Sequence, residues 1–445
     1  MKRTRKYQFL LAGLISVGSL GVFAQAEEPV KDSIQIMQED VEGLKSSIKR
    51  LQKLKISGYF QLQSEFAQEW TSTKVGGTTS YQSNRDSEKG NFHRFGIRRG
   101  RVKMTWDEKM AQAVFQLDIT ENGVGMKDAY VKVWDPWLKV VTLTGGVFDR
   151  PFGDEISYSS SRRESPERSQ MFQALFPDER DLGVMLTLAA PKGSVVEGLK
   201  LDAGLFCGNG IRRNEHGRMS DLIAHLKYDK KWSSMAFGVG ASLYHGKVNN
   251  GDTLLWTVED SKWTSEIVER NRLNKRQYFG LDAQFSVETK WGITNIRGEY
   301  LMGTQPSTPG SFNSPRGNPN TYGMTASTDF FSHLRKFTGG HVYFIQDIYK
   351  TPLTLVLKYG YLNPNTEIKG SAVSNRTDIA NNYYGMGLLW KVTSYIRLQA
   401  YYDMAVNERS DNVPVTKTTA EKGTDRDYSK TVAANLFTLR LQYRF

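Results

Sequence analysis

The sequence has few of the residues that build disulfides, zinc sites and most catalytic centres. Its 445 residues include a single cysteine, Cys207, so it can form no internal disulfide and no cysteine-based zinc site. The six histidines are scattered, and none has the HExxH spacing of a zinc protease. No motif places a nucleophile beside a general base. We therefore expect no cofactor, no bound metal and no enzymatic activity.

Long hydrophobic runs are also missing, except near the start of the chain. Residues 1–8 are basic, residues 9–23 are apolar, and residues 24–26 (AQA) have the small side chains of a cleavage site. This layout is typical of a secretory signal peptide over residues 1–26, with an uncleaved membrane anchor as the alternative. No later stretch contains the ~18 consecutive apolar residues that a membrane-spanning helix needs.

Aromatic residues and glycine, in contrast, are plentiful. Aromatic residues make up 12% of the chain and glycine contributes 40 residues, although the mean hydropathy is −0.49. Four basic residues belong to the predicted signal peptide, so the net charge of +12 becomes +8 without them. An exported chain with this composition is typical of an outer-membrane β-barrel, whose strands have a weak hydropathy signal.

A helical pattern occupies only residues 27–55. Six apolar residues follow one another at spacings of 3, 4, 3, 4 and 3, namely Ile34, Met37, Val41, Leu44, Ile48 and Leu51. This spacing predicts a short coiled-coil helix in the periplasm, and six acidic and six basic residues leave it neutral. The helix would either self-associate or lie on its own barrel. Because it has fewer than three full heptads, self-association would depend on the barrels holding the helices together.

From residue 56 onward, apolar and polar residues alternate strictly, as in a strand with one apolar and one polar face. Such segments recur sixteen times, at 56–66, 99–106, 111–119, 127–134, 140–148, 182–189, 199–207, 221–228, 236–244, 278–285, 293–300, 337–346, 353–361, 383–390, 396–402 and 437–445. Long polar connections alternate with tight turns between them. We therefore predict an all-β fold, a 16-stranded antiparallel transmembrane β-barrel over residues 56–445, in which the last strand pairs with the first.

If the apolar rows face lipid, the polar rows line the lumen. The basic residues predicted to point inward include Arg99, Arg101, Lys103, Lys132, Lys200, Lys227, Arg297, Lys358, Arg397 and Arg440. A β-bulge is expected near Arg98, because Phe95 and Ile97 fall out of phase with the rest of their strand. Basic rows around a pore attract anions. Inward acidic residues such as Asp128 and Glu299 could instead pair with them and leave a weakly selective lumen.

Five short motifs resemble the phosphate-selective porin O and P family. They lie at 98–101 (RRGR), 127–131 (KDAYV), 146–155 (GVFDRPFGDE), 167–169 (ERS) and 177–183 (PDERDLG). The resemblance implies a sixteen-stranded trimeric porin whose third loop, residues 149–181, folds into the barrel and narrows it. It also implies basic residues at the constriction, Arg162, Arg163, Arg168 and Arg180, and a ladder along the wall, Arg99, Arg101 and Lys103.

The third loop departs from a simple anion-binding pattern. It contains five basic and eight acidic residues, a net charge of −3, so phosphate specificity does not follow from the resemblance. Some of these acids could attach the loop to basic residues of the wall. The alternative is an ordinary surface loop in contact with lipopolysaccharide.

The sequence thus predicts a passive diffusion channel for small solutes in the outer membrane of a Gram-negative cell. We expect it to prefer anions, phosphate-type anions included. Its expected partners are the lipid bilayer, lipopolysaccharide and two further copies in a homotrimer, with no nucleic acid. The alternatives are a weakly selective general porin, a structural or adhesive barrel and, as the least favoured, a membrane-embedded enzyme.

Overall fold

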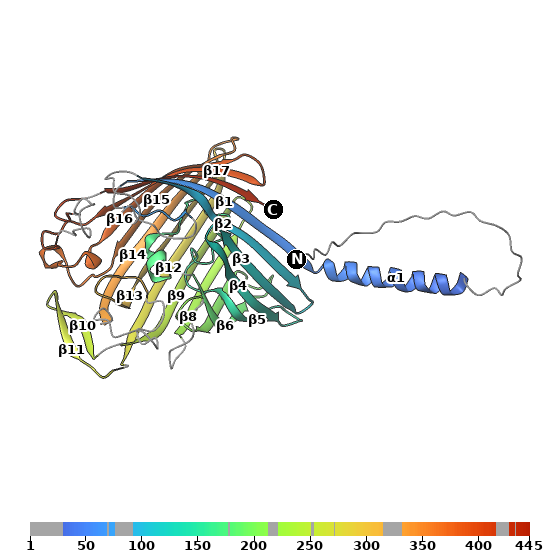
Figure 1. Cartoon of the computed structure of the whole chain (residues 1–445), viewed down its shortest axis with the longest axis horizontal. Coiled ribbons are helices and arrows are strands. Elements are labelled where there is room, and N and C mark those ends of the chain that lie inside the picture. Colours follow the sequence, from blue (N-terminus) through green and yellow to red (C-terminus); the bar gives the residue numbers. More distant parts are fainter. Residues whose placement is uncertain are drawn as a thin grey trace, which may run out of the picture. The chain divides into compact units, whose positions relative to one another are not determined.

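The structure is a computed structural model that describes residues 30–68, 71–75, 92–176, 179–211, 221–250, 253–270, 272–314, 332–414, 427–431 and 433–445. The predicted signal peptide, residues 1–26, lies outside the described residues. The chain divides into two compact units, Met1–Gln52 and Lys53–Phe445. The first unit contains one described helix, and the second is a β-barrel (Figure 1).

The helix of the first unit, α1, spans Val30–Leu51. From Met37 to Leu51 its apolar stripe is open to solvent, with exposed fractions from 46% at Val41 to 67% at Leu51. A stripe of this kind is what a coiled coil buries, so self-association of α1 stays a prediction. Nowhere in the described ranges does a helix have both the length and the hydropathy needed to cross a membrane.

The second unit is a closed barrel, which confirms the predicted sixteen-stranded fold. The described residues form eighteen strands: β1 (Leu54–Ala67), β2 (Phe92–Asp107), β3 (Ala111–Thr120), β4 (Gly123–Trp134), β5 (Val141–Asp149), β6 (Arg180–Ala189), β7 (Leu199–Phe206), β8 (Asp221–Lys231), β9 (Met235–Asn249), β10 (Leu254–Glu259), β11 (Lys262–Ile267), β12 (Leu273–Thr289), β13 (Gly292–Ser307), β14 (Ser332–Asp347), β15 (Leu353–Asn363), β16 (Asn381–Lys391), β17 (Ile396–Asn407) and β18 (Ala433–Arg444). Strands β10 and β11 form a separate hairpin, and the other sixteen pair antiparallel around the barrel.

Closure occurs between the first and last strands, where Gln61 pairs with Gln442. Phe445 and Gly58 exchange two backbone hydrogen bonds of 3.0 Å, so the pairing continues to the last residue. The alternation sets the two faces, because Leu439 and Leu441 are exposed outward while Arg440 between them is buried. A closed sheet with an apolar outer surface has no free edge and can lie in lipid.

A β-bulge in β2 lies where the sequence predicted it. Gln61 pairs with Arg99, but the next residue, Leu62, pairs with Ile97, which leaves Arg98 as the extra residue. The bulge turns the consecutive residues Arg98 and Arg99 to the same side of the wall, and both reach one carboxylate inside the barrel.

The hairpin β10–β11 was not predicted; it lies in the long connection between the predicted strands 236–244 and 278–285. Its two-residue turn, Asp260 and Ser261, has positive φ at both positions, as in the tight turns that favour hairpins. Because these residues lack the usual Asn-Gly or Asp-Gly signal, the turn is hard to recognise in the sequence. The hairpin also pairs with β14 over two residues, Ser332 and His333, so a distant strand helps to hold it.

Candidate functional site

The segment between β5 and β6, residues 150–179, is called L3 here. It makes hydrogen bonds with inward-facing side chains on separate parts of the wall. Tyr59 of β1 meets Ser160 at 2.5 Å between hydroxyl oxygens, and Tyr343 of β14 meets Ser165 at 2.8 Å. The backbone NH of Gly153 donates to Ser242 of β9 at 2.9 Å. L3 therefore runs through the interior of the barrel.

One side of L3 is apolar and packs into a buried core. The short helix α2 (Gln170–Leu175) presents Phe172, which is 1% exposed, and Phe176 follows it. The core also includes L3 residues Phe152, Ile156, Met171 and Leu175 and the wall residues Phe206, Ile223, Tyr244, Tyr278, Leu301, Phe337 and Leu362. Burial of each large apolar side chain contributes about 1.5–3 kcal/mol, so this side provides most of the attachment of L3.

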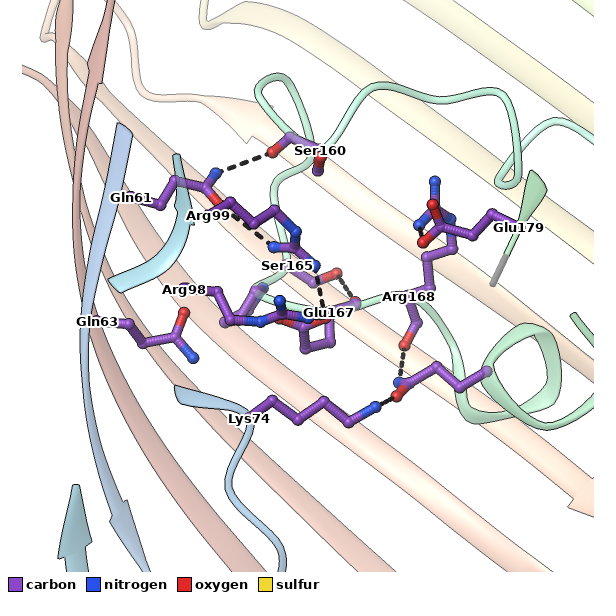
Figure 2. Close-up of polar contacts among 12 residues, drawn as sticks. Gln61, Gln63, Lys74, Arg98, Arg99, Ser160, Ser165, Glu167, Arg168 and Glu179 are labelled. Carbon is purple, nitrogen blue, oxygen red and sulfur yellow. Dashed lines mark hydrogen bonds and ion pairs between the residues drawn. The ribbon is translucent and has the colours of Figure 1, made fainter. Parts of the chain in front are cut away.

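The opposite side of L3 is attached through Glu167. Arg98 donates two hydrogen bonds to this carboxylate, at 2.7 and 2.8 Å, and Arg99 donates one at 2.9 Å (Figure 2). Arg440 of β18 donates at 3.3 Å. Burial opposes the charge of Glu167, but Arg98, Arg99 and Arg440 hold the pKa of its carboxyl well below the usual range. The carboxylate of Glu167 in L3 thus accepts hydrogen bonds from three arginines of the wall.

The other described acids of L3 are engaged as well. Glu164 pairs with Arg297 of β13, and Asp154 pairs with Lys227 of β8 at 2.9 Å. Glu155 accepts hydrogen bonds from Ser169 and, at 3.0 Å, from the Tyr343 hydroxyl. The net negative charge of L3 is therefore used in contacts with the wall and with the loop itself, which is what an inward-folded loop needs.

Arg168 and Arg180 belong to a chain of alternating charges near the base of L3. Both pair with Glu179, and Lys127 approaches the same carboxylate at 3.2 Å. Arg180 also pairs with Asp128 at 2.8 Å. Arg180 is the first residue of β6 and so belongs to the wall, which corrects its predicted place within the third loop.

Two cavities lie on opposite sides of L3, and Arg168 borders both. The larger, about 770 Å³, lies toward the short-turn rim, because Gly58 and Phe445 line it. The smaller, about 300 Å³, lies toward the long-loop rim, where Thr71 and Ala434 line it. Arg168 and the charged groups that contact it therefore lie between the two cavities.

The remaining predicted site residues differ in their surroundings. Lys103 and Lys132 line the larger cavity, and neither forms an ion pair within the ranges described. Arg101 pairs with Asp118 at 3.2 Å. Arg397 donates to the backbone carbonyls of Arg162 and Arg163, so it supports L3 from the wall.

Arg162 and Arg163 are neighbours with opposite environments. Arg162 is exposed, whereas Arg163 is 1% exposed. None of the three guanidinium nitrogens of Arg163 has a hydrogen-bond partner among the residues that the structure describes. Burial, assisted by nearby Arg99, lowers the pKa of Arg163 to about 10.

Sequence reasoning missed three residues of this site. For two of them the sequence holds a signal. The predicted bulge at Arg98 and the ERS motif that contains Glu167 mark both positions, but neither pattern predicts that the two residues form an ion pair. Lys74, which lines the smaller cavity, has no such signal in the sequence. It lies in a polar stretch that looked like a surface loop, and only the fold places it inside.

The fold is that of outer-membrane porins. No model of a known protein family matches the chain, and no curated protein sequence does. Three solved structures are similar over most of their length. The anion-selective porin of Comamonas acidovorans has a TM-score of 0.52 at 10% identity and covers 88% of this chain and 99% of its own. OmpF of Salmonella typhi has a TM-score of 0.51 at 10% identity and covers 88% of this chain and 97% of its own. OprB of Pseudomonas putida has a TM-score of 0.50 at 8% identity and covers 90% of this chain and 96% of its own.

Proposed function

We propose that the chain is a porin of the outer membrane, a passive channel and not an enzyme, through which small hydrophilic solutes diffuse with a preference for anions. The single observation behind this proposal is the charge around the larger cavity. Lys103 and Lys132 face it without an ion-pair partner in the described part of the chain, while Asp154, the L3 acid that also lines it, is paired with Lys227. Unpaired positive charge along a water-filled path attracts anions and repels cations.

L3 would set the width of the path. It is held on one side by the apolar core around Phe172 and on the other by Glu167, so its backbone cannot easily move out of the lumen. The two cavities would be the entrance and exit spaces of the channel. Small anions in general, and phosphate-type anions among them, are the solutes that we propose.

A bilayer measurement with the purified full-length protein tests this function. With a KCl gradient across a planar bilayer, the reversal potential should show that chloride is more permeant than potassium. The double variant Lys103→Gln/Lys132→Gln should lose much of this preference, and Lys109→Gln, an exposed residue of the β2–β3 turn, should not. Absence of current, or a strong preference for potassium, would contradict the proposal.

Phosphate can be examined in the same experiment. If phosphate is a solute, adding it to the KCl solution should reduce the chloride current as it competes for the constriction. An unchanged chloride current would contradict phosphate as a solute, while the proposed channel for small anions would stand.

We also propose a homotrimer, in which α1 would form the coiled coil. The outer surface of β3–β7 supports it, because among the exposed large apolar residues within these five strands only Phe115 is aromatic; exposed Trp137 lies in the turn between β4 and β5. Every strand from β12 to β18 carries at least one, namely Phe279, Tyr300, Phe344, Tyr359, Tyr384, Tyr402 and Phe437. Aromatic side chains gather where a barrel meets the lipid interface, so β3–β7 has the composition of a subunit contact. Crosslinking through Leu186→Cys in a Cys207→Ser background should give linked subunits, and Leu357→Cys should not.

A further inference from the structure

The described part of the loop between β1 and β2, residues 71–75, lies inside the barrel. Thr73 and Val75 have no exposed surface. Val75 lies so close to Gly96 of β2 that a side-chain carbon at position 96 would overlap it. Between them, the backbone NH of Lys74 donates to Glu65 of β1 at 2.7 Å. These contacts give Lys74 a fixed place in the lumen.

The side chain of Lys74 connects this loop to L3. Its ammonium group donates to the amide oxygen of Gln173 in α2, and Gln173 in turn donates to the backbone carbonyl of Arg168 at 2.6 Å. Figure 2 shows Lys74 beside the cluster formed by Arg98 and Glu167, from which it is separate. Its acceptor is a neutral amide.

The charge of Lys74 is therefore less compensated than that of its neighbours. Arg98, Arg99 and Arg440 share the carboxylate of Glu167, whereas Lys74 has no carboxylate within ion-pair distance among the residues described. Lys74 also lines the cavity on the long-loop side of L3, close to the point where Arg168 separates the two cavities. A fixed cation without a carboxylate in ion-pair distance, beside the loop that crosses the lumen, acts directly on passing ions.

We propose that Lys74, from the first loop, determines anion selectivity on the long-loop side of the constriction. This inference rests on the proposed channel function and adds a second loop to the selectivity site. A unit charge about 7 Å from a hydrated ion stabilises chloride and destabilises potassium by equal amounts, so it changes their permeability ratio roughly sevenfold, by Coulomb's law in water.

The selectivity should also depend on pH. Burial in the lumen lowers the pKa of Lys74 to about 8; Glu167 opposes the shift and Arg98 and Arg99 reinforce it. Below pH 8 the residue is charged and attracts anions, and above pH 8 the charge and the attraction are lost. The charged groups that face Lys74 from the surrounding elements and the cavity are Glu65, Arg98, Arg99, Glu167, Arg168, Lys358, Asp403 and Arg440.

The test uses the full-length protein in planar bilayers, with reversal potentials in a KCl gradient at pH 6.5, 8.0 and 9.5, values chosen to lie about 1.5 units on either side of this pKa. The wild type should lose roughly sevenfold in the chloride-to-potassium ratio as the pH rises. Lys74→Met should have the low ratio at every pH, and Lys74→Arg the high ratio at every pH. Lys350→Met, at an exposed lysine of the β14–β15 turn, should behave as the wild type.

A cysteine variant provides a second test of Lys74 in case Lys74→Met does not fold. In Lys74→Cys with Cys207→Ser, a cationic thiol reagent should restore the chloride preference and an anionic reagent should reduce it. Wild-type selectivity in Lys74→Met at pH 6.5, or equal effects of the two reagents, would overturn the role of Lys74. A wild type without current would instead overturn the channel function itself, so the two failures can be distinguished.

Discussion

The two halves of the lumen hold L3 by different interactions. Toward β7–β9 and β12–β15, L3 packs its aromatic side chains into a dry core around Phe172. Toward β18, β1 and β2, it meets the wall through Glu167 and three arginines. Apolar burial is strongly stabilising, whereas a buried ion pair roughly balances its own cost of desolvation. The comparison indicates that the apolar half keeps L3 in place, and we propose that the charges of the polar half act on the solutes that pass.

The largest expected effect comes from the apolar half. Phe172→Ala should lower the free energy of unfolding by about 3–5 kcal/mol, because it opens a cavity in the core. Urea unfolding of the protein in lipid vesicles measures this, and single-channel conductance should rise as L3 loosens. Phe279→Ala, at an exposed outward position of β12, is the matched control and should change both quantities much less. Equal effects of the two variants would show that the core does not hold L3.

A smaller effect is expected in the polar half. Glu167→Gln removes the common partner of Arg98, Arg99 and Arg440. Its cost in unfolding free energy should be nearer the lower end of the ~3–5 kcal/mol typical of breaking a buried ion pair, because the adjoining cavity admits water. The reversal potential should move toward stronger chloride preference, since one negative charge is lost. A change in stability without any change in selectivity would mean that the path avoids this cluster.

The smallest effect should follow from removing one arginine of the cluster. Arg99→Ala leaves Arg98 and Arg440 on Glu167, so the local net charge changes while every carboxylate stays paired. We expect a smaller loss of chloride preference than with Lys103→Gln, whose charge has no partner among the described residues. Reversal potentials of the two variants under identical salt gradients compare them directly. A larger effect of Arg99→Ala would reverse the assignment of paired and unpaired charges.

Much of the barrel could be predicted because strand patterning is local. All sixteen barrel strands were predicted at their observed places, and the slip in phase before Arg99 was enough to locate the bulge at Arg98. The alternation failed at the ends of tall strands such as β9 and β12, which pair beyond their apolar segments up to Asn249 and Leu273. There the backbones of the two strands continue to pair, although apolar and polar residues no longer alternate in the sequence.

The two-residue period in the sequence determined by itself which side chains face the lumen, because that property depends only on neighbours along one strand. The partner of each charge was decided by the tertiary structure alone. Glu167, Arg98 and Arg440 meet only after the barrel closes and L3 crosses it, and Lys74 enters the lumen only because its loop folds inward. Glu167 lies 69 positions from Arg98 and 273 from Arg440, so no local pattern records these pairings.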